Sequence, residues 1–159
     1  MAQGHWLLKS EPEVYPFSQL VADGKTTWDG VRNPQARSFL AAMAPGDLVF
    51  FYHSHDAEVV GIASVTRAAF PDPTAGDPRW LAVELAAVKP LESAVSLETI
   101  KADPALAKLR LVTQSRLSVM PVERAQWDRI LALARRGEGR PEPSPQGPRG
   151  RAASRRRAK

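Results

Sequence analysis

The last 23 residues constrain most strongly what this chain can fold into. Residues 137–159 contain no Leu, Ile, Val or aromatic residue. Such a segment cannot bury enough apolar surface to offset the entropy that it would lose on ordering. We therefore expect one domain in residues 1–136, followed by a disordered Arg/Pro/Gly-rich tail at residues 137–159.

The two parts of the chain also differ in charge. The net charge is +5, but residues 135–159 hold nine Arg or Lys against two Glu, whereas residues 1–134 hold thirteen against fifteen acids. The folded part is thus close to neutral, and it could bind nucleic acid only through a local site. The basic tail by itself could bind any polyanion with strong salt dependence and little specificity. Nonspecific binding through the tail is therefore one alternative function.

The sequence has no cysteine. This excludes disulfides, thiolate nucleophiles and Cys-type zinc sites. Charged residues interrupt the N-terminal apolar run, so it does not fit a signal peptide, and no stretch approaches the ~20 apolar residues of a membrane span. We expect a cytoplasmic protein without membrane association.

Short strand-like and helix-like segments alternate in residues 1–136. Apolar or alternating runs predict strands at residues 5–9, 47–52, 59–65, 80–88 and 117–119. Capping and amphipathic patterns predict helices at residues 16–22, after Asn33, from about residue 96 and at 123–134. Three prolines predict a loop at residues 70–78. These segments indicate an α+β domain built around a small mixed sheet or barrel.

Four motifs of this sequence resemble the EVE family. They are WLLKSEP at 6–12, WDGVRNPQAR at 28–37, FFYHS at 50–54 with VG at 60–61, and QSRLS at 114–118. The match runs collinearly over about residues 4–134, so it is far more specific than any single motif. The resemblance implies a PUA-like fold, a mixed β-barrel flanked by short helices and related to the YTH readers. It also implies a pocket between the first strand and the tryptophan-bearing turn, used for binding without a cofactor.

A pocket for one base needs an aromatic face and hydrogen-bonding groups for the base edge. Trp28, followed by the turn-forming Asp29, is the expected stacking residue, with core packing as the alternative. The carboxylate of Glu11 suits the exocyclic amine of cytosine or adenine, unless Glu11 is simply a solvated strand end. The full set of expected pocket residues is Lys9, Ser10, Glu11, Trp28, Asp29, Tyr52, His53 and Ser54. We expect Trp6, Trp80 and Trp127 to pack in the core instead.

Contacts to the flanking phosphates are expected from Arg32, Asn33, Arg37 and Arg116. Planar guanidinium groups match phosphate oxygens well, whereas Asn33 is better explained as a helix N-cap. The expected partner is DNA or RNA with a modified base, such as methylated or hydroxymethylated cytosine or methylated adenine. The sequence does not distinguish between these ligands.

The main rival function is a small metal-dependent or hydrolytic enzyme that uses His53, His55 and Asp56. A metal site usually needs three or four ligands that converge from rigid elements, and these three residues share one turn. The sequence also lacks a GxSxG elbow, a phosphate-binding GK[ST] loop and an HExxH helix. A non-catalytic nucleic-acid reader is therefore the favoured interpretation.

Overall fold

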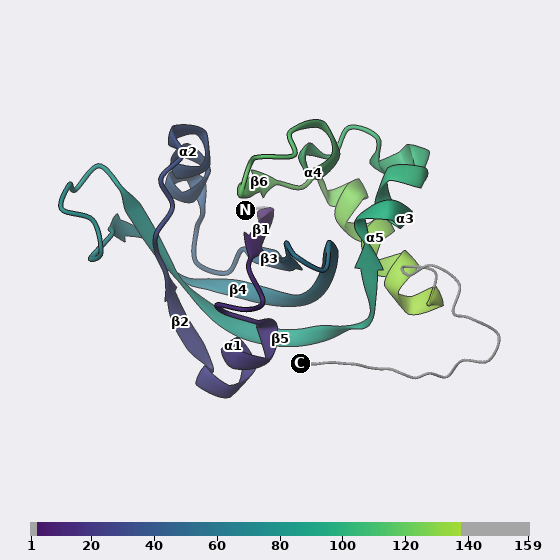
Figure 1. Ribbon diagram of the computed structural model, residues 1–159, viewed down its shortest axis with the longest axis horizontal. Helices are drawn as coiled ribbons and strands as arrows, with labels where there is room; N and C mark the ends of the chain where they lie inside the picture. The colour runs from purple at the N-terminus through teal and green to yellow at the C-terminus, as the bar shows by residue number, and fades with distance from the viewer. Residues whose placement is uncertain (1–2, 138–159) are drawn as a thin grey trace.

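A six-stranded mixed sheet runs through the computed structural model, which describes residues 3–137 (Figure 1). The strands are β1 (His5–Ser10), β2 (Lys25–Trp28), β3 (Leu48–His53), β4 (Glu58–Pro71), β5 (Leu81–Ser96) and β6 (Val119–Pro121). Their order in the sheet is β2-β5-β4-β3-β1-β6. The β1–β3 pair is parallel and the other pairs are antiparallel. The expected α+β class is confirmed. Of the tail at residues 137–159, which we expected to be disordered, only Gly137 belongs to the described residues.

Short helices flank the sheet. They are α1 (Phe17–Asp23), α2 (Pro34–Ala42), α3 (Leu97–Ala102), α4 (Arg110–Thr113) and α5 (Arg124–Arg136), with a 3₁₀ turn at Pro104–Leu106. The expected cap of α2 is present, because Asn33 Oδ1 accepts a hydrogen bond from the Ala36 N–H at 2.9 Å. Gly137 caps the C-terminal end of α5, and its φ of +72° favours glycine. Within residues 3–137, no helix is long and apolar enough to cross a membrane.

The β4–β5 hairpin is longer than the sequence indicated. Strand β4 continues through Phe70 and Pro71, where we expected a loop, because these residues pair with Ala82 and Leu81. Strand β5 likewise continues beyond residue 88 to Ser96. Pro90 is tolerated there because the β4–β5 register shifts around its partner Gly61. These register shifts bend the long hairpin and extend one end of it beside α2 (Figure 1).

Strand β2 was not predicted from the sequence because it is short and polar. Its residues KTTW alternate between exposed and half-buried side chains, and it pairs only with β5 at the edge of the sheet. Strand β6 also begins two residues later than the predicted strand at 117–119. Both errors concern edge strands, whose pattern is weaker because only part of one face is covered.

The core lies between the sheet and the helices. Trp6 and Trp127 are buried as expected, and Trp127 stacks on Phe50 with ring centroids 3.7 Å apart. The expectation for Trp80 is wrong, because its ring is only half-buried and packs against arginine side chains. The Phe17 ring lies so close to Gly61 that a Cβ atom there would be 2.5 Å from it. This contact brings α1 onto the sheet beside the cleft described next.

Candidate functional site

A cleft of about 810 Å³ opens between the ends of β1 and β2 and the start of α2. This volume falls within the ~300–1,000 Å³ that is typical of small-ligand sites. Seven of the expected residues line it: Lys9, Ser10, Glu11, Trp28, Asp29, Arg32 and Asn33. The structure therefore brings together the ends of the first two motifs, although they are distant in the sequence.

Trp28 is the aromatic wall of the cleft. It ends β2 opposite Val83 of β5, and strand alternation puts it on the half-buried face of β2 with Thr26. Its ring makes edge contacts with Phe51 and Tyr15 at centroid distances of 5.5 and 6.0 Å. Trp28 is thus braced by two aromatic rings while part of its surface still faces the cleft.

The end of β1 supplies polar groups to the cleft. The Ser10 side chain is buried, and its hydroxyl donates to the Tyr15 carbonyl at 2.5 Å, which ties the strand end to the next turn. Glu11 is exposed at the rim. The Lys9 ammonium donates to the Ser115 carbonyl at 2.6 Å, and burial lowers its pKa. Of these three residues, Glu11 has the side chain most available to a ligand.

Asp29 and Asn33 lie on the opposite rim, next to Trp28. Asp29 is exposed, and no hydrogen bond or ion pair ties its carboxylate to the described residues. It directly follows β2, and it is among the residues that line the cleft. Asn33 contributes to the wall, but its side-chain oxygen is already used as the α2 cap. Asp29 can therefore serve as a hydrogen-bond acceptor for a ligand, and Asn33 can offer only its amide group.

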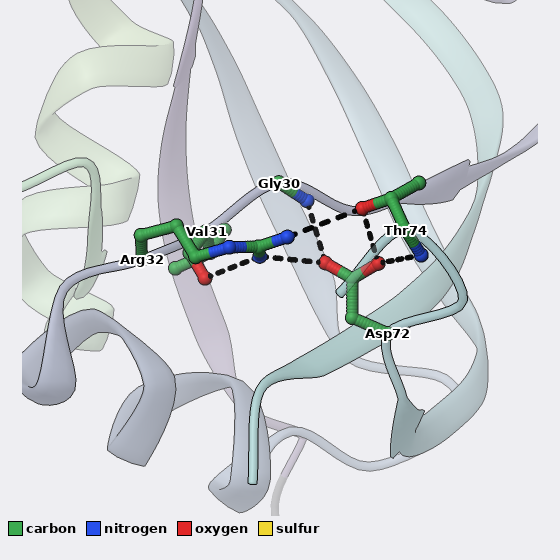
Figure 2. A network of polar contacts seen from close by, with 5 residues as sticks. All are labelled: Gly30, Val31, Arg32, Asp72 and Thr74. Atoms are coloured by element: carbon green, nitrogen blue, oxygen red, sulfur yellow. Dashed lines mark hydrogen bonds and ion pairs between the residues drawn. The ribbon is translucent and has the colours of Figure 1, made fainter. Parts of the chain in front are cut away.

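A buried carboxylate holds the rim that follows Trp28 (Figure 2). The Asp72 side chain is 0% exposed, and it accepts hydrogen bonds from the Gly30 N–H at 2.8 Å and from Arg32 Nη1 at 2.9 Å. Its other oxygen accepts from the N–H and hydroxyl of Thr74. Burial alone would raise the pKa of Asp72, but the hydrogen bonds from Thr74, Arg32 and Gly30 outweigh it and hold the pKa well below its usual range.

Arg32 therefore has a structural role that the sequence did not reveal. Its guanidinium also donates to the Val31 carbonyl at 3.1 Å and to the Thr74 hydroxyl at 3.3 Å. These bonds use the planar fork that we expected to contact phosphate. Arg32 lines the cleft, but mainly it anchors the rim to the Asp72 loop.

Three expected pocket residues, Tyr52, His53 and Ser54, are not among the residues that line the cleft. Tyr52 is buried, and burial together with the nearby Glu58 carboxylate raises its pKa to about 12. His53 Nε2 accepts a hydrogen bond from the Phe17 N–H at 3.0 Å, so this imidazole caps the start of α1. The Ser54 hydroxyl donates to the Ser10 carbonyl at 3.3 Å. All three support the elements around the cleft without lining it.

Arg37 and Arg116 also lie outside the cleft lining. Arg37, on α2, packs over the Trp80 ring with its guanidinium carbon 4.8 Å from the ring centroid. Arg116 is exposed in the turn between Ser115 and Ser118, and Ser118 does line the cleft. Both arginines belong to segments that also supply lining residues, because Pro34 begins the helix of Arg37 and Ser118 closely follows Arg116.

The residues of the rival enzyme hypothesis do not converge. His53 faces Phe17 of α1, whereas the exposed His55 pairs with Glu13 at 3.3 Å. Asp56 lies 3.7 Å from His53 Nδ1, which is an ion-pair distance between two groups only. Among residues 3–137, no three His, Asp or Glu side chains are grouped so that they could hold a metal ion.

The sequence analysis missed several residues of the site. Tyr15, Thr26 and Ser118 line the cleft, as does Val14, which is 74% exposed. The alternation in KTTW could have identified Thr26 as a neighbour of Trp28 on one face, had the strand been recognised. No local pattern indicates Tyr15 or the rim anchor Asp72, because the cleft residues that they contact, such as Trp28 and Arg32, are distant from them in the sequence.

Comparison with known proteins identifies the family of this chain. The family model described as "EVE domain" matches residues 4–133. Thymocyte nuclear protein 1 of Mus musculus is 34% identical over 164 residues, which cover 81% of this chain and 73% of that protein.

Solved structures extend the likeness to the fold. A crystal structure of a protein from Agrobacterium tumefaciens has 42% sequence identity and a TM-score of 0.81, with 82% of this chain and 92% of that chain covered. Human THYN1, solved in complex with 5-methylcytosine containing DNA, has 32% identity and a TM-score of 0.77, with 83% and 98% covered. By family match, sequence identity and fold, this chain belongs to the EVE domain family.

Proposed function

We propose that this protein is a non-catalytic reader that binds one modified base of DNA in the cleft beside Trp28. The observation that carries the proposal is a braced, partly exposed indole in a cleft that is also lined by the carboxylates of Glu11 and Asp29. The DNA complex of the human relative supports DNA as the nucleic acid and 5-methylcytosine as the modified base.

The cleft matches the chemistry of a cytosine. Stacking of a base on an aromatic side chain contributes about 1–3 kcal/mol. An ionised carboxylate only accepts hydrogen bonds, so Glu11 or Asp29 suits the exocyclic amine of cytosine and does not suit the O4 carbonyl of thymine. The base would have to leave the duplex stack to reach Trp28, at a cost of a few kcal/mol.

An apolar surface in the cleft is available to a methyl group. Val14 is highly exposed and lines the cleft, so contact with a ligand would bury it. Burial of one methyl-sized group contributes about 0.8 kcal/mol, which corresponds to roughly a fourfold preference for the methylated base. We therefore expect moderate discrimination from methyl burial alone.

Substitution of Trp28 tests the proposal. Binding of the full chain to duplexes that differ only in one cytosine, 5-methylcytosine, 5-hydroxymethylcytosine or N6-methyladenine would be measured by fluorescence anisotropy. Trp28→Ala should weaken binding of the preferred duplex roughly 5- to 150-fold, the equivalent of a lost stacking interaction of about 1–3 kcal/mol. It should also bring the ratio of modified to unmodified affinity close to one.

Two control variants separate stacking from folding. Trp28→Phe keeps an aromatic face against Phe51 and should retain most of the preference. Arg124→Gln, on α5, removes a charge far from the cleft and should leave the preference unchanged. If Trp28→Ala remains folded by circular dichroism and keeps the wild-type preference ratio, the proposed site is wrong.

A further inference from the structure

We propose that the end of the β4–β5 hairpin is a second nucleic-acid contact surface, on which Arg37 and Arg67 bind phosphates of the strand that flanks the base in the cleft. We call this surface the hairpin end and define it by Arg37, Arg67, Phe70 and Trp80. The inference rests on the proposed function, which it extends from the base pocket to the sugar–phosphate backbone.

Each of these arginines lies over an aromatic ring. The guanidinium carbon of Arg37 is 4.8 Å from the centroid of Trp80, and that of Arg67 is 4.1 Å from the centroid of Phe70. Packing on a ring holds a guanidinium in place but uses none of its five N–H donors. Both groups are therefore oriented in advance while they keep their hydrogen-bonding capacity.

Neither arginine forms an ion pair with a carboxylate of residues 3–137, although Asp77, which pairs with Arg79, also attracts Arg37 electrostatically. The other two arginines near this end of the hairpin have such partners, since Arg32 pairs with Asp72 at 2.9 Å and Arg79 with Asp77 at 2.8 Å. Within the described part of the chain, Arg37 and Arg67 make no side-chain ion pair or hydrogen bond. Their charge is thus available to an anionic partner, and phosphate matches the guanidinium geometry.

Trp80 differs in its surroundings from the buried Trp6 and Trp127. Its half-buried ring lies outside the core, where Arg32 approaches it at 5.8 Å and Arg37 at 4.8 Å. The carbonyl of Trp80 accepts a hydrogen bond from the Asp72 N–H at 2.8 Å, which closes the base of the loop. The Trp80 ring, held in place by the hairpin, therefore packs against the guanidinium of Arg37, which belongs to α2.

The hairpin end adjoins the cleft through the rim anchor. Arg32 lines the cleft and bonds to Asp72, as Figure 2 shows for the bond. Its guanidinium carbon also lies 5.8 Å from the centroid of the Trp80 ring, so one side chain connects the pocket to the surface. Figure 1 shows this end of the hairpin beside α2, on the side of the molecule away from α5. A strand with one base beside Trp28 therefore has a neighbouring basic surface along which its backbone can run.

The salt dependence of binding tests this surface. A plot of log affinity against log salt concentration has a negative slope, and each phosphate contact that is lost makes this slope shallower by about 0.9 for duplex DNA. We would measure this slope for the full chain with a duplex that contains one 5-methylcytosine. Arg37→Gln and Arg67→Gln should each make the slope shallower by about 0.9. Neither should change the ratio of the affinities for the methylated and the unmodified duplex. Arg37→Lys should keep the slope because it keeps the charge.

Matched variants exclude a general charge effect. Arg124→Gln changes the net charge equally but lies on α5, where it pairs with Asp128, and it should leave the slope unchanged. Trp80→Leu keeps every charge and should weaken binding, because Arg37 loses the ring that positions it. Circular dichroism of each variant confirms that the fold is intact.

The outcomes separate this inference from the function on which it rests. If the Arg37 and Arg67 variants keep the wild-type slope, or lose no more of it than Arg124→Gln, the hairpin end is not a phosphate contact, although a base reader at Trp28 would stand. If their slopes fall while the wild-type protein shows no preference among bases, the hairpin end binds phosphate and the reader function fails. If an acidic peptide competes as effectively as the duplex, the assignment to nucleic acid is overturned.

Discussion

Asp72→Asn should show how much the buried rim anchor contributes to stability. The two carboxylate oxygens of Asp72 accept four hydrogen bonds, from the Gly30 N–H, Arg32 Nη1, and the N–H and hydroxyl of Thr74. An asparagine has the same shape but only one acceptor oxygen, so its NH₂ group must face a backbone N–H whichever way the amide is turned.

The magnitude follows from this arrangement. Removing one partner of a buried ion pair typically costs about 3–5 kcal/mol. Arg32 is 41% exposed and can be solvated again, which favours the lower end, about 3 kcal/mol. At about 2–4 °C per kcal/mol, the melting temperature should fall by roughly 10 °C. Urea denaturation at pH 7 would measure the loss as a lower midpoint with an unchanged slope.

The effect should depend on pH in one direction. Because the folded-state pKa of Asp72 lies below its unfolded value, the unfolded chain takes up this proton first as the pH falls. The contribution of Asp72 is thus fully present above about pH 4 and is lost below it, toward the folded-state pKa. The difference in stability between wild type and Asp72→Asn should therefore shrink in acid.

Asp77→Asn, at an exposed pair on the same loop, is the matched control and should have no measurable effect on the urea midpoint. A midpoint for Asp72→Asn equal to that of wild type, or a difference that does not change between pH 7 and pH 3, would refute the reasoning.

Two further predictions concern the elements behind the cleft. Gly61→Ala should destabilise the protein by about 1–3 kcal/mol, because its Cβ would lie 2.5 Å from the Phe17 ring, and a urea midpoint equal to that of wild type would contradict this packing. The imidazole of His53 should titrate by NMR with a pKa below 6.5, because burial lowers it and because protonation would remove the acceptor for the Phe17 N–H. The stabilising contribution of neutral His53 should accordingly be present above about pH 6.5 and be lost as the pH falls through the folded-state pKa, so a measured pKa above 6.5 would show that this capping bond is absent.

Helix caps and core strands were predictable because their signals are local. Asn33-Pro34 indicated the start of α2, and the apolar run at residues 5–9 indicated β1. Such signals depend only on neighbours within a few residues along the chain. The motif WDGVRNPQAR likewise pointed to Trp28 and Asp29 as neighbours in one turn, and the structure places both in the cleft lining.

The sequence did not reveal the roles of residues that depend on distant partners. FFYHS looked like a pocket wall, yet His53 caps α1 through Phe17, which is 36 positions away. Arg32 looked like a free phosphate ligand, yet it bonds to Asp72, which is 40 positions away. No periodicity in the sequence encodes such pairings, because they arise only when the sheet brings separate segments together.

The sequence by itself determined most of the short elements, the family and the aromatic residue on which the proposed function rests. These follow from composition and local pattern, which govern burial and capping. Only the tertiary structure decided which polar side chains remain available to a ligand and which serve the fold. A buried carboxylate, a strand partner or an aromatic ring contributed from a distant segment determines whether a charged group is satisfied within the protein or open to solvent.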